Sequence, residues 1–196
     1  SRILGDHGAP GMETEIAIHS HSLPFEFPAA VVAEAEAFGA RIPQDAIAGR
    51  DSHFRGTQGT SIIGLFGGAA AWTGASEKTL KRLGDDDFEK AYLFPNSHAG
   101  YYPGAKLIAL KFIFRKSDGR VLGAQPLGED APAVDKRISA LAVAIQMGAT
   151  IYDLEEAELC YAPQFGSAKD AINYAGMVAA NVLDGEMPLA HWDAAE

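Results

Sequence analysis

Residues 105–125, AKLIALKFIFRKSDGRVLGAQ, decide the fold. Within residues 105–115 every second position from 108 to 114 is a large apolar residue, which predicts a β-strand with one buried face. Asp118-Gly119 is typical of a hairpin turn, so residues 120–125 should return as the antiparallel partner strand. The apolar face of the first strand consists of Ile108, Leu110, Phe112 and Phe114.

The stretch before this hairpin predicts further strands and a short helix. Residues 60–73, TSIIGLFGGAAAWT, form an apolar run with three glycines, typical of one strand that bends or bulges. Ser76 is a good helix N-cap, and Gly84 should end the helix that it begins. A third strand is expected from residue 89 up to Pro95.

Two helices are expected after the hairpin. In residues 131–148, from the cap Asp130 to Gly148, the apolar residues are spaced along one helical face. Residues 168–184 predict a second helix, rich in small residues and ended by Gly185. The acidic segment 151–159 between them should be exposed to solvent. This order of elements predicts an α+β fold, an antiparallel sheet with helices packed on one face. The apolar residues of the first helix are Val134, Ile138, Leu141 and Ile145.

Composition narrows the class of protein. The chain has 196 residues and a formal net charge of −10, which argues against nucleic acid and anionic lipid as partners. No apolar run approaches the roughly 20 residues that span a bilayer. The first residues lack the pattern of a signal peptide, so a cytoplasmic protein is expected.

Several kinds of catalytic site find little support. The sequence has neither a GxGxxG nor a P-loop motif. His7, His19 and His21 could bind a metal, but alternating histidines in an acidic segment more often lie in solvent, and no metal site is predicted. Cys160, the one cysteine, has no cationic neighbour to activate it and is expected to be a buried structural thiol.

Two aromatic loops remain as candidate functional segments. They are residues 97–104, SHAGYYPG, and residues 160–170, CYAPQFGSAKD. The second loop enters a helix, whose N-terminus together with Lys169 would suit an anion. The alternative is that the loop tyrosines cover a core or an oligomer interface, and the residues alone leave both interpretations open.

Three stretches resemble one known family. Residues 49–62, GRDSHFRGTQGTSI, residues 97–114 and residues 158–183 resemble the C-terminal part of the pyridine nucleotide-disulfide oxidoreductases. The similarity is greatest to the coenzyme A-disulfide reductase, coenzyme A-persulfide reductase and NADH oxidase group. In that family this segment is the dimerisation domain, an antiparallel sheet with helices packed against it.

The resemblance implies a homodimeric enzyme that uses FAD and NAD(P)H to reduce coenzyme A disulfides or persulfides. Tyr101 or Tyr102, together with Tyr161, would then support catalysis in the partner subunit's active site. The family's nucleotide fingerprints and its redox-cysteine motif are missing here, so no cofactor is expected on this chain alone. The alternative is a stand-alone module for coenzyme A or a nucleotide, with Lys169 contacting a phosphate.

The resemblance also divides the chain. Residues 56–186 would be the dimerisation domain, and residues 1–55 are a poorly assigned segment that could include a remnant of a flavin-binding domain. Residues 187–196, MPLAHWDAAE, resemble the linker into a rhodanese domain.

Overall fold

The hairpin predicted from residues 105–125 lies at the centre of the sheet. In the computed structural model, which describes residues 57–191, strands β4 (Ile108–Arg115) and β5 (Val121–Gly128) pair antiparallel. Gly119 takes the positive φ of 71° that their turn requires. The strand β5 runs past the expected end at residue 125, because Pro126 is tolerated where the pairing with the next strand is interrupted.

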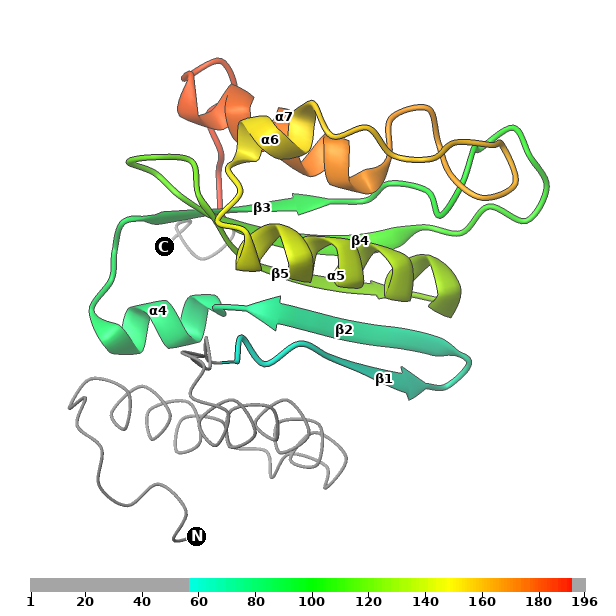
Figure 1. Ribbon diagram of the computed structural model, residues 1–196, viewed down its shortest axis with the longest axis horizontal. Helices are drawn as coiled ribbons and strands as arrows, with labels where there is room; N and C mark the ends of the chain where they lie inside the picture. The colour runs from blue at the N-terminus through cyan, green and yellow to red at the C-terminus, as the bar shows by residue number, and fades with distance from the viewer. Residues whose placement is uncertain (1–56, 192–196) are drawn as a thin grey trace, which may run out of the picture. The chain divides into compact units, whose positions relative to one another are not determined.

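The apolar run 60–73 is a second hairpin, so the prediction of one bent strand is wrong. Strands β1 (Ser61–Leu65) and β2 (Gly68–Gly74) pair antiparallel over their whole length. Phe66 and Gly67 between them both have positive φ, 47° and 86°, as a tight two-residue hairpin turn requires. With β3 (Phe88–Leu93) the sheet has the order β1-β2-β5-β4-β3, and every pairing is antiparallel (Figure 1).

The helix α4 (Glu77–Leu83) carries the chain from β2 to β3, and both of its predicted ends are confirmed. The Ser76 side chain accepts a hydrogen bond from the Thr79 backbone N–H at 3.1 Å. Gly84 ends the helix in the left-handed conformation, with φ at 72°.

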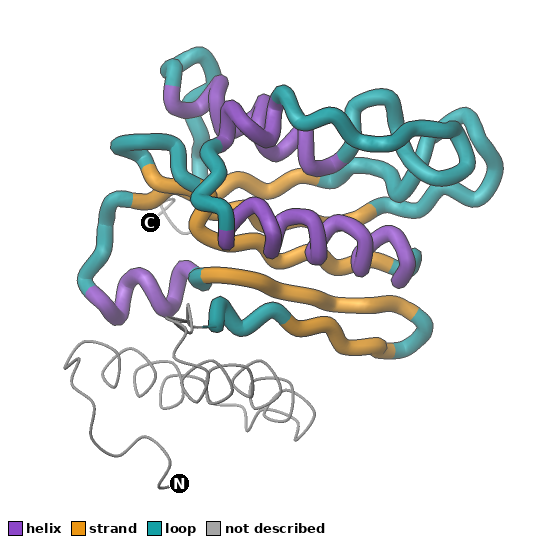
Figure 2. Tube along the Cα trace, viewed as in Figure 1, coloured by secondary structure: helices purple, strands orange, loops and turns teal. Residues whose placement is uncertain are grey.

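Helices α5 (Ala131–Gln146), α6 (Ile151–Glu155) and α7 (Ala171–Leu183) lie together on one face of the sheet (Figures 1 and 2). The predicted α+β fold is therefore confirmed. The expected helix over 168–184 begins later than predicted, because Asp170 acts as its N-cap and leaves residues 168 and 169 in the loop.

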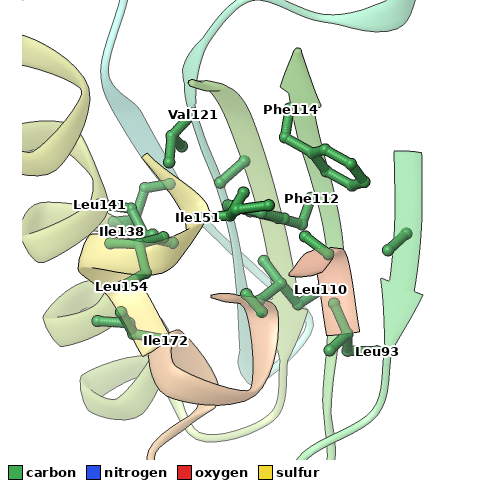
Figure 3. Close-up of a cluster of buried hydrophobic side chains, with 14 of the residues drawn as sticks. Leu93, Leu110, Phe112, Phe114, Val121, Ile138, Leu141, Ile151, Leu154 and Ile172 are labelled. Carbon is green, nitrogen blue, oxygen red and sulfur yellow. The ribbon is translucent and has the colours of Figure 1, made fainter. Parts of the chain in front are cut away.

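The core lies between these helices and the sheet (Figure 3). The alternate residues predicted for the apolar face of β4 are all buried, and Phe112 and Phe114 stack at 5.9 Å. The acidic segment after α5 exposes its carboxylates to solvent, as expected. Among residues 57–191 no helix has the length and apolar character needed to cross a membrane. The side chains labelled in Figure 3 are Leu93, Leu110, Phe112, Phe114, Val121, Ile138, Leu141, Ile151, Leu154 and Ile172.

The opposite face of the sheet carries a charged cluster. Lys90 of β3 and Lys111 of β4 alternate with residues of the core face, so their side chains leave the sheet on the other side. Both amines donate to the Glu77 carboxylate, at 2.7 and 2.6 Å, and Lys81 lies 2.9 Å from it. Glu77 thereby ties α4 to two strands.

Candidate functional site

The first aromatic loop connects β3 to β4 and is closed at its base. The Ser97 backbone N–H donates to the Lys106 carbonyl at 2.7 Å, and the Lys106 N–H donates back to the Ser97 hydroxyl at 3.1 Å. Ser97, His98 and Ala99 are buried. The tip that follows, with Tyr101 at its start, projects from a fixed base.

The second aromatic loop runs from α6 to α7 and lies against the first (Figure 1). The Ala99 N–H donates to the carbonyls of Gly166, at 2.9 Å, and Pro163, at 3.2 Å. Within the second loop the Phe165 N–H donates to the Ala162 carbonyl at 2.9 Å. Backbone hydrogen bonds therefore fix the position of one loop relative to the other.

This arrangement of the two loops brings Tyr101 and Tyr161 together. Their hydroxyl oxygens are 2.6 Å apart, although both side chains are exposed. A phenol carries one donor, so one hydroxyl donates to the other and the second keeps its hydrogen for an outside acceptor. The hydrogen bond with Tyr101, helped by desolvation, raises the pKa of Tyr161 above its ordinary value of 10.0. The Tyr161 hydroxyl therefore stays protonated, and able to donate, at physiological pH.

Tyr102 does not join this pair. Its ring packs edge-on against the buried His98 ring, with centroids 5.7 Å apart at an angle of 82°. Its backbone N–H donates to the Ala99 carbonyl at 2.9 Å. Of the two tyrosines that the resemblance left open in this loop, Tyr101 is the one beside Tyr161.

Lys169 lines a hollow whose wall includes neither Tyr101 nor Tyr161. The hollow is open, with a volume of about 310 Å³, and its wall also includes Glu155 and Glu158. The Lys169 amine lies 3.5 Å from the Met177 sulfur. Two carboxylates on the wall oppose the binding of a phosphate, so the geometry gives the coenzyme A-binding alternative little support.

Cys160 is exposed, so the expectation of a buried structural thiol is wrong. Its segment crosses the surface between α6 and α7 rather than entering the core. Within residues 57–191 no group of three or more His, Cys, Asp or Glu side chains could hold a metal ion. The histidines considered for a metal, His7, His19 and His21, lie outside the described residues.

Sequence reasoning missed the buried polar residues beneath the two loops. Arg137 of α5 is 1% exposed, and it contacts the carbonyl of Ser97 and the carboxylate of Asp170. The sequence did contain a signal for this residue: Arg137 is a charged residue one turn after Val134, on the apolar face of the predicted helix. Such a residue usually marks a paired, functional or structural charge.

The antiparallel sheet with its covering helices defines a class of protein, which comparison with known families confirms. The pyridine nucleotide-disulphide oxidoreductase dimerisation domain matches residues 64–172, more than half of the chain. The chain belongs to this family. The cold shock domain also matches residues 1–28, a short segment outside the described residues that assigns no family here.

The relatives that this chain matches include coenzyme A disulfide reductases and a persulfide reductase. The coenzyme A disulfide reductase of Staphylococcus epidermidis is 34% identical over 139 residues, which are 70% of this chain and 31% of that protein. The structure of reduced Bacillus anthracis CoADR-RHD is 44% identical with a TM-score of 0.73, covering 77% of this chain and 27% of that one.

An NAD-dependent persulfide reductase from A. fulgidus is also similar, with 37% identity and a TM-score of 0.68. The match covers 73% of this chain and 26% of the other. The chain therefore spans about a third or less of the relatives that it matches.

Proposed function

We propose that residues 56–186 are the dimerisation domain of an FAD-dependent, NAD(P)H-using reductase of coenzyme A disulfides or persulfides. In this proposal the domain forms a two-fold dimer and presents Tyr101 and Tyr161 to the partner subunit's active site. Residues 187–196 would lead toward a rhodanese domain. The observation that carries the proposal is the tyrosine pair, which lies on two loops joined by backbone hydrogen bonds and is exposed to solvent.

The chemistry of the pair suits a leaving sulfur. A thiolate released from a disulfide carries a developing negative charge, and a neutral hydroxyl stabilises it by donating a hydrogen bond. The hydrogen bond between Tyr101 and Tyr161 orients one phenol and leaves one hydroxyl hydrogen available to an outside acceptor. The pair thus supplies a preorganised hydrogen-bond donor, and the raised pKa of Tyr161 keeps that hydroxyl protonated.

FAD and NAD(P)H would supply the electrons from other domains of the parent enzyme. The described residues include no glycine-rich turn between a strand and a helix that would cradle the pyrophosphate of a dinucleotide. The described residues therefore do not fit either cofactor.

A broad exposed apolar surface supports a role in an assembly. Large apolar side chains gathered on one surface commonly mark the place where another chain or domain packs. An open hollow of about 510 Å³ on the described part of the chain has such a lining. Its large apolar residues are Phe66, Phe94, Leu107 and Leu127.

Light scattering after size-exclusion chromatography tests the dimer. We expect the full chain to elute at twice its mass of 20.7 kDa at micromolar concentration. A clean monomer at high micromolar concentration would contradict the proposal. Calorimetry with coenzyme A tests the alternative module: micromolar affinity that falls on Lys169→Ala would favour it over the dimerisation domain.

A chimera tests the tyrosines. It joins residues 57–191 to the preceding part of the Staphylococcus epidermidis coenzyme A disulfide reductase. We expect Tyr161→Phe and Tyr101→Phe to lower kcat about tenfold or more, less than the ~10²–10³ of an oxyanion donor because sulfur is a weaker acceptor. Tyr102→Phe, the same change in the same loop, should have little effect. Equal losses in all three variants would refute the assignment.

A further inference from the structure

Arg137 is the most deeply buried charged side chain on the face of α5 that meets the two aromatic loops. Its guanidinium is bonded on every nitrogen. The Nε and Nη2 atoms donate to the two carboxylate oxygens of Asp170, at 3.0 and 2.8 Å. Nη1 donates to the Ala133 carbonyl at 3.0 Å, within its own helix.

The remaining bond of Arg137 reaches the other loop. Nη2 also donates to the Ser97 carbonyl at 2.9 Å. Ser97 lies four residues before Tyr101, in the base of the first loop. Asp170 ends the loop that carries Tyr161 and caps α7, where its side chain accepts from the Ile172 N–H at 3.3 Å. One guanidinium therefore bonds both tyrosine-bearing loops.

Arg137 and Asp170 are both buried, and moving one away from the other would leave a buried charge without its partner, which is costly. This fork, the two-bond pair of Arg137 and Asp170, therefore has little freedom to shift. The planar guanidinium binds a carboxylate through two parallel bonds and still has a donor for a carbonyl at a fixed angle. A lysine amine is a point charge on a flexible stem and cannot reproduce that geometry. The neighbouring Lys136, which donates to the Phe165 carbonyl at 3.0 Å, bonds only the second loop.

We propose that Arg137 is a positioning residue that holds the Tyr101 and Tyr161 hydroxyls at hydrogen-bonding distance by fixing both loops to α5. Its importance for catalysis rests on the proposed function, but the positioning itself does not. If the fork were merely structural, replacing it would lower stability and leave the tyrosine pair intact.

Tyrosine titration by NMR on the full chain, labelled with ¹³C at the tyrosine Cζ, separates these two roles. Tyr161→Phe identifies the Tyr161 signal, and Tyr101→Phe should return the pKa of Tyr161 to the ordinary range of about 10. Arg137→Lys should do the same.

The matched control is Val121→Ala, which creates a cavity in the core. Val121 begins β5, at the end of the sheet away from the two loops. It should lower stability and leave the pKa of Tyr161 raised. The proposal is overturned if Arg137→Lys leaves that pKa raised, if Val121→Ala lowers it equally, or if it is not raised in the unchanged chain.

Should Arg137→Lys fail to fold, Asp170→Asn gives the same test. Asparagine caps a helix as well as aspartate but cannot form the charged fork, so the pKa of Tyr161 should again fall. A raised pKa in that variant would overturn the proposal. Because the titration involves no substrate, failure of coenzyme A chemistry or of dimerisation in other experiments would leave this result unchanged.

Discussion

Replacing Glu77 with glutamine should lower the free energy of unfolding by about 3 kcal/mol. Its carboxylate accepts from Lys90 and Lys111, whose side chains are 7% and 19% exposed. Removing one partner of a buried ion pair costs about 3–5 kcal/mol, since the other charge loses its compensation. The lower end applies because Lys111 reaches water and the glutamine amide still offers one acceptor oxygen.

The effect should depend on pH in a defined direction. Burial raises the pKa of Glu77, but hydrogen bonds from Lys111, Lys90 and Lys81 outweigh burial and hold it well below its ordinary value of 4.5. A carboxyl with a lowered pKa in the folded state stabilises the fold above its unfolded pKa and loses that contribution as pH falls. The difference between the two proteins should therefore be full at neutral pH and shrink below about pH 4.5.

Urea unfolding followed by circular dichroism measures this difference. Lys81→Gln is the matched control, because it removes an exposed i,i+4 partner of the same carboxylate and should cost only about 0.5 kcal/mol. The reasoning is refuted if Glu77→Gln costs no more than Lys81→Gln, or if its effect does not decrease on acidification.

Two further predictions concern α6 and α7. Gly176→Ala should cost about 2 kcal/mol in urea unfolding, because an added Cβ would press on the Glu155 and Ile151 backbone, whereas Gly64→Ala, whose Cβ would lie 3.9 Å from its nearest neighbour, should be nearly neutral; equal costs would contradict this. Asp153 accepts hydrogen bonds from the Thr150 backbone and hydroxyl, which lower its pKa below 3.8, so the cap on α6 should weaken only as pH falls below that value. In NMR titration Thr150→Val should move that pKa back up, and an unchanged pKa would rule out the hydroxyl as a cause.

Local periodicity predicted the centre of the sheet and its covering helices. The alternation in β4, the turn at Asp118 and the stripe on α5 each depend on residues close in sequence, and each is confirmed. The hairpin of β1 and β2 was missed because Phe66 stands where Asn, Asp or Gly usually begins such a turn, and the turn lies inside a continuous apolar run. Such a run does not indicate where a strand reverses.

The candidate functional site depends on contacts between residues far apart in the sequence, which no local pattern can indicate. The resemblance singled out Tyr101 and Tyr161, but their pairing depends on backbone bonds between loops about 60 residues apart. The buried position of Arg137 was not predicted, because the helical periodicity was judged from the apolar residues of α5 and gave no weight to a single charged residue among them. Cys160 was expected to be buried from its residue type, whereas the surface course of its loop decides its exposure.

The position of β5 in the sheet has a consequence for how the chain is made. β2 pairs with β5, which is synthesised after β3 and β4 although it lies between β2 and β4. A nascent chain that has emerged only as far as β4 therefore presents an unpaired β2 edge, a template for association with other chains. Until Gly128 has left the ribosome, the first hairpin has no place to dock, and shortened products ending before it should aggregate.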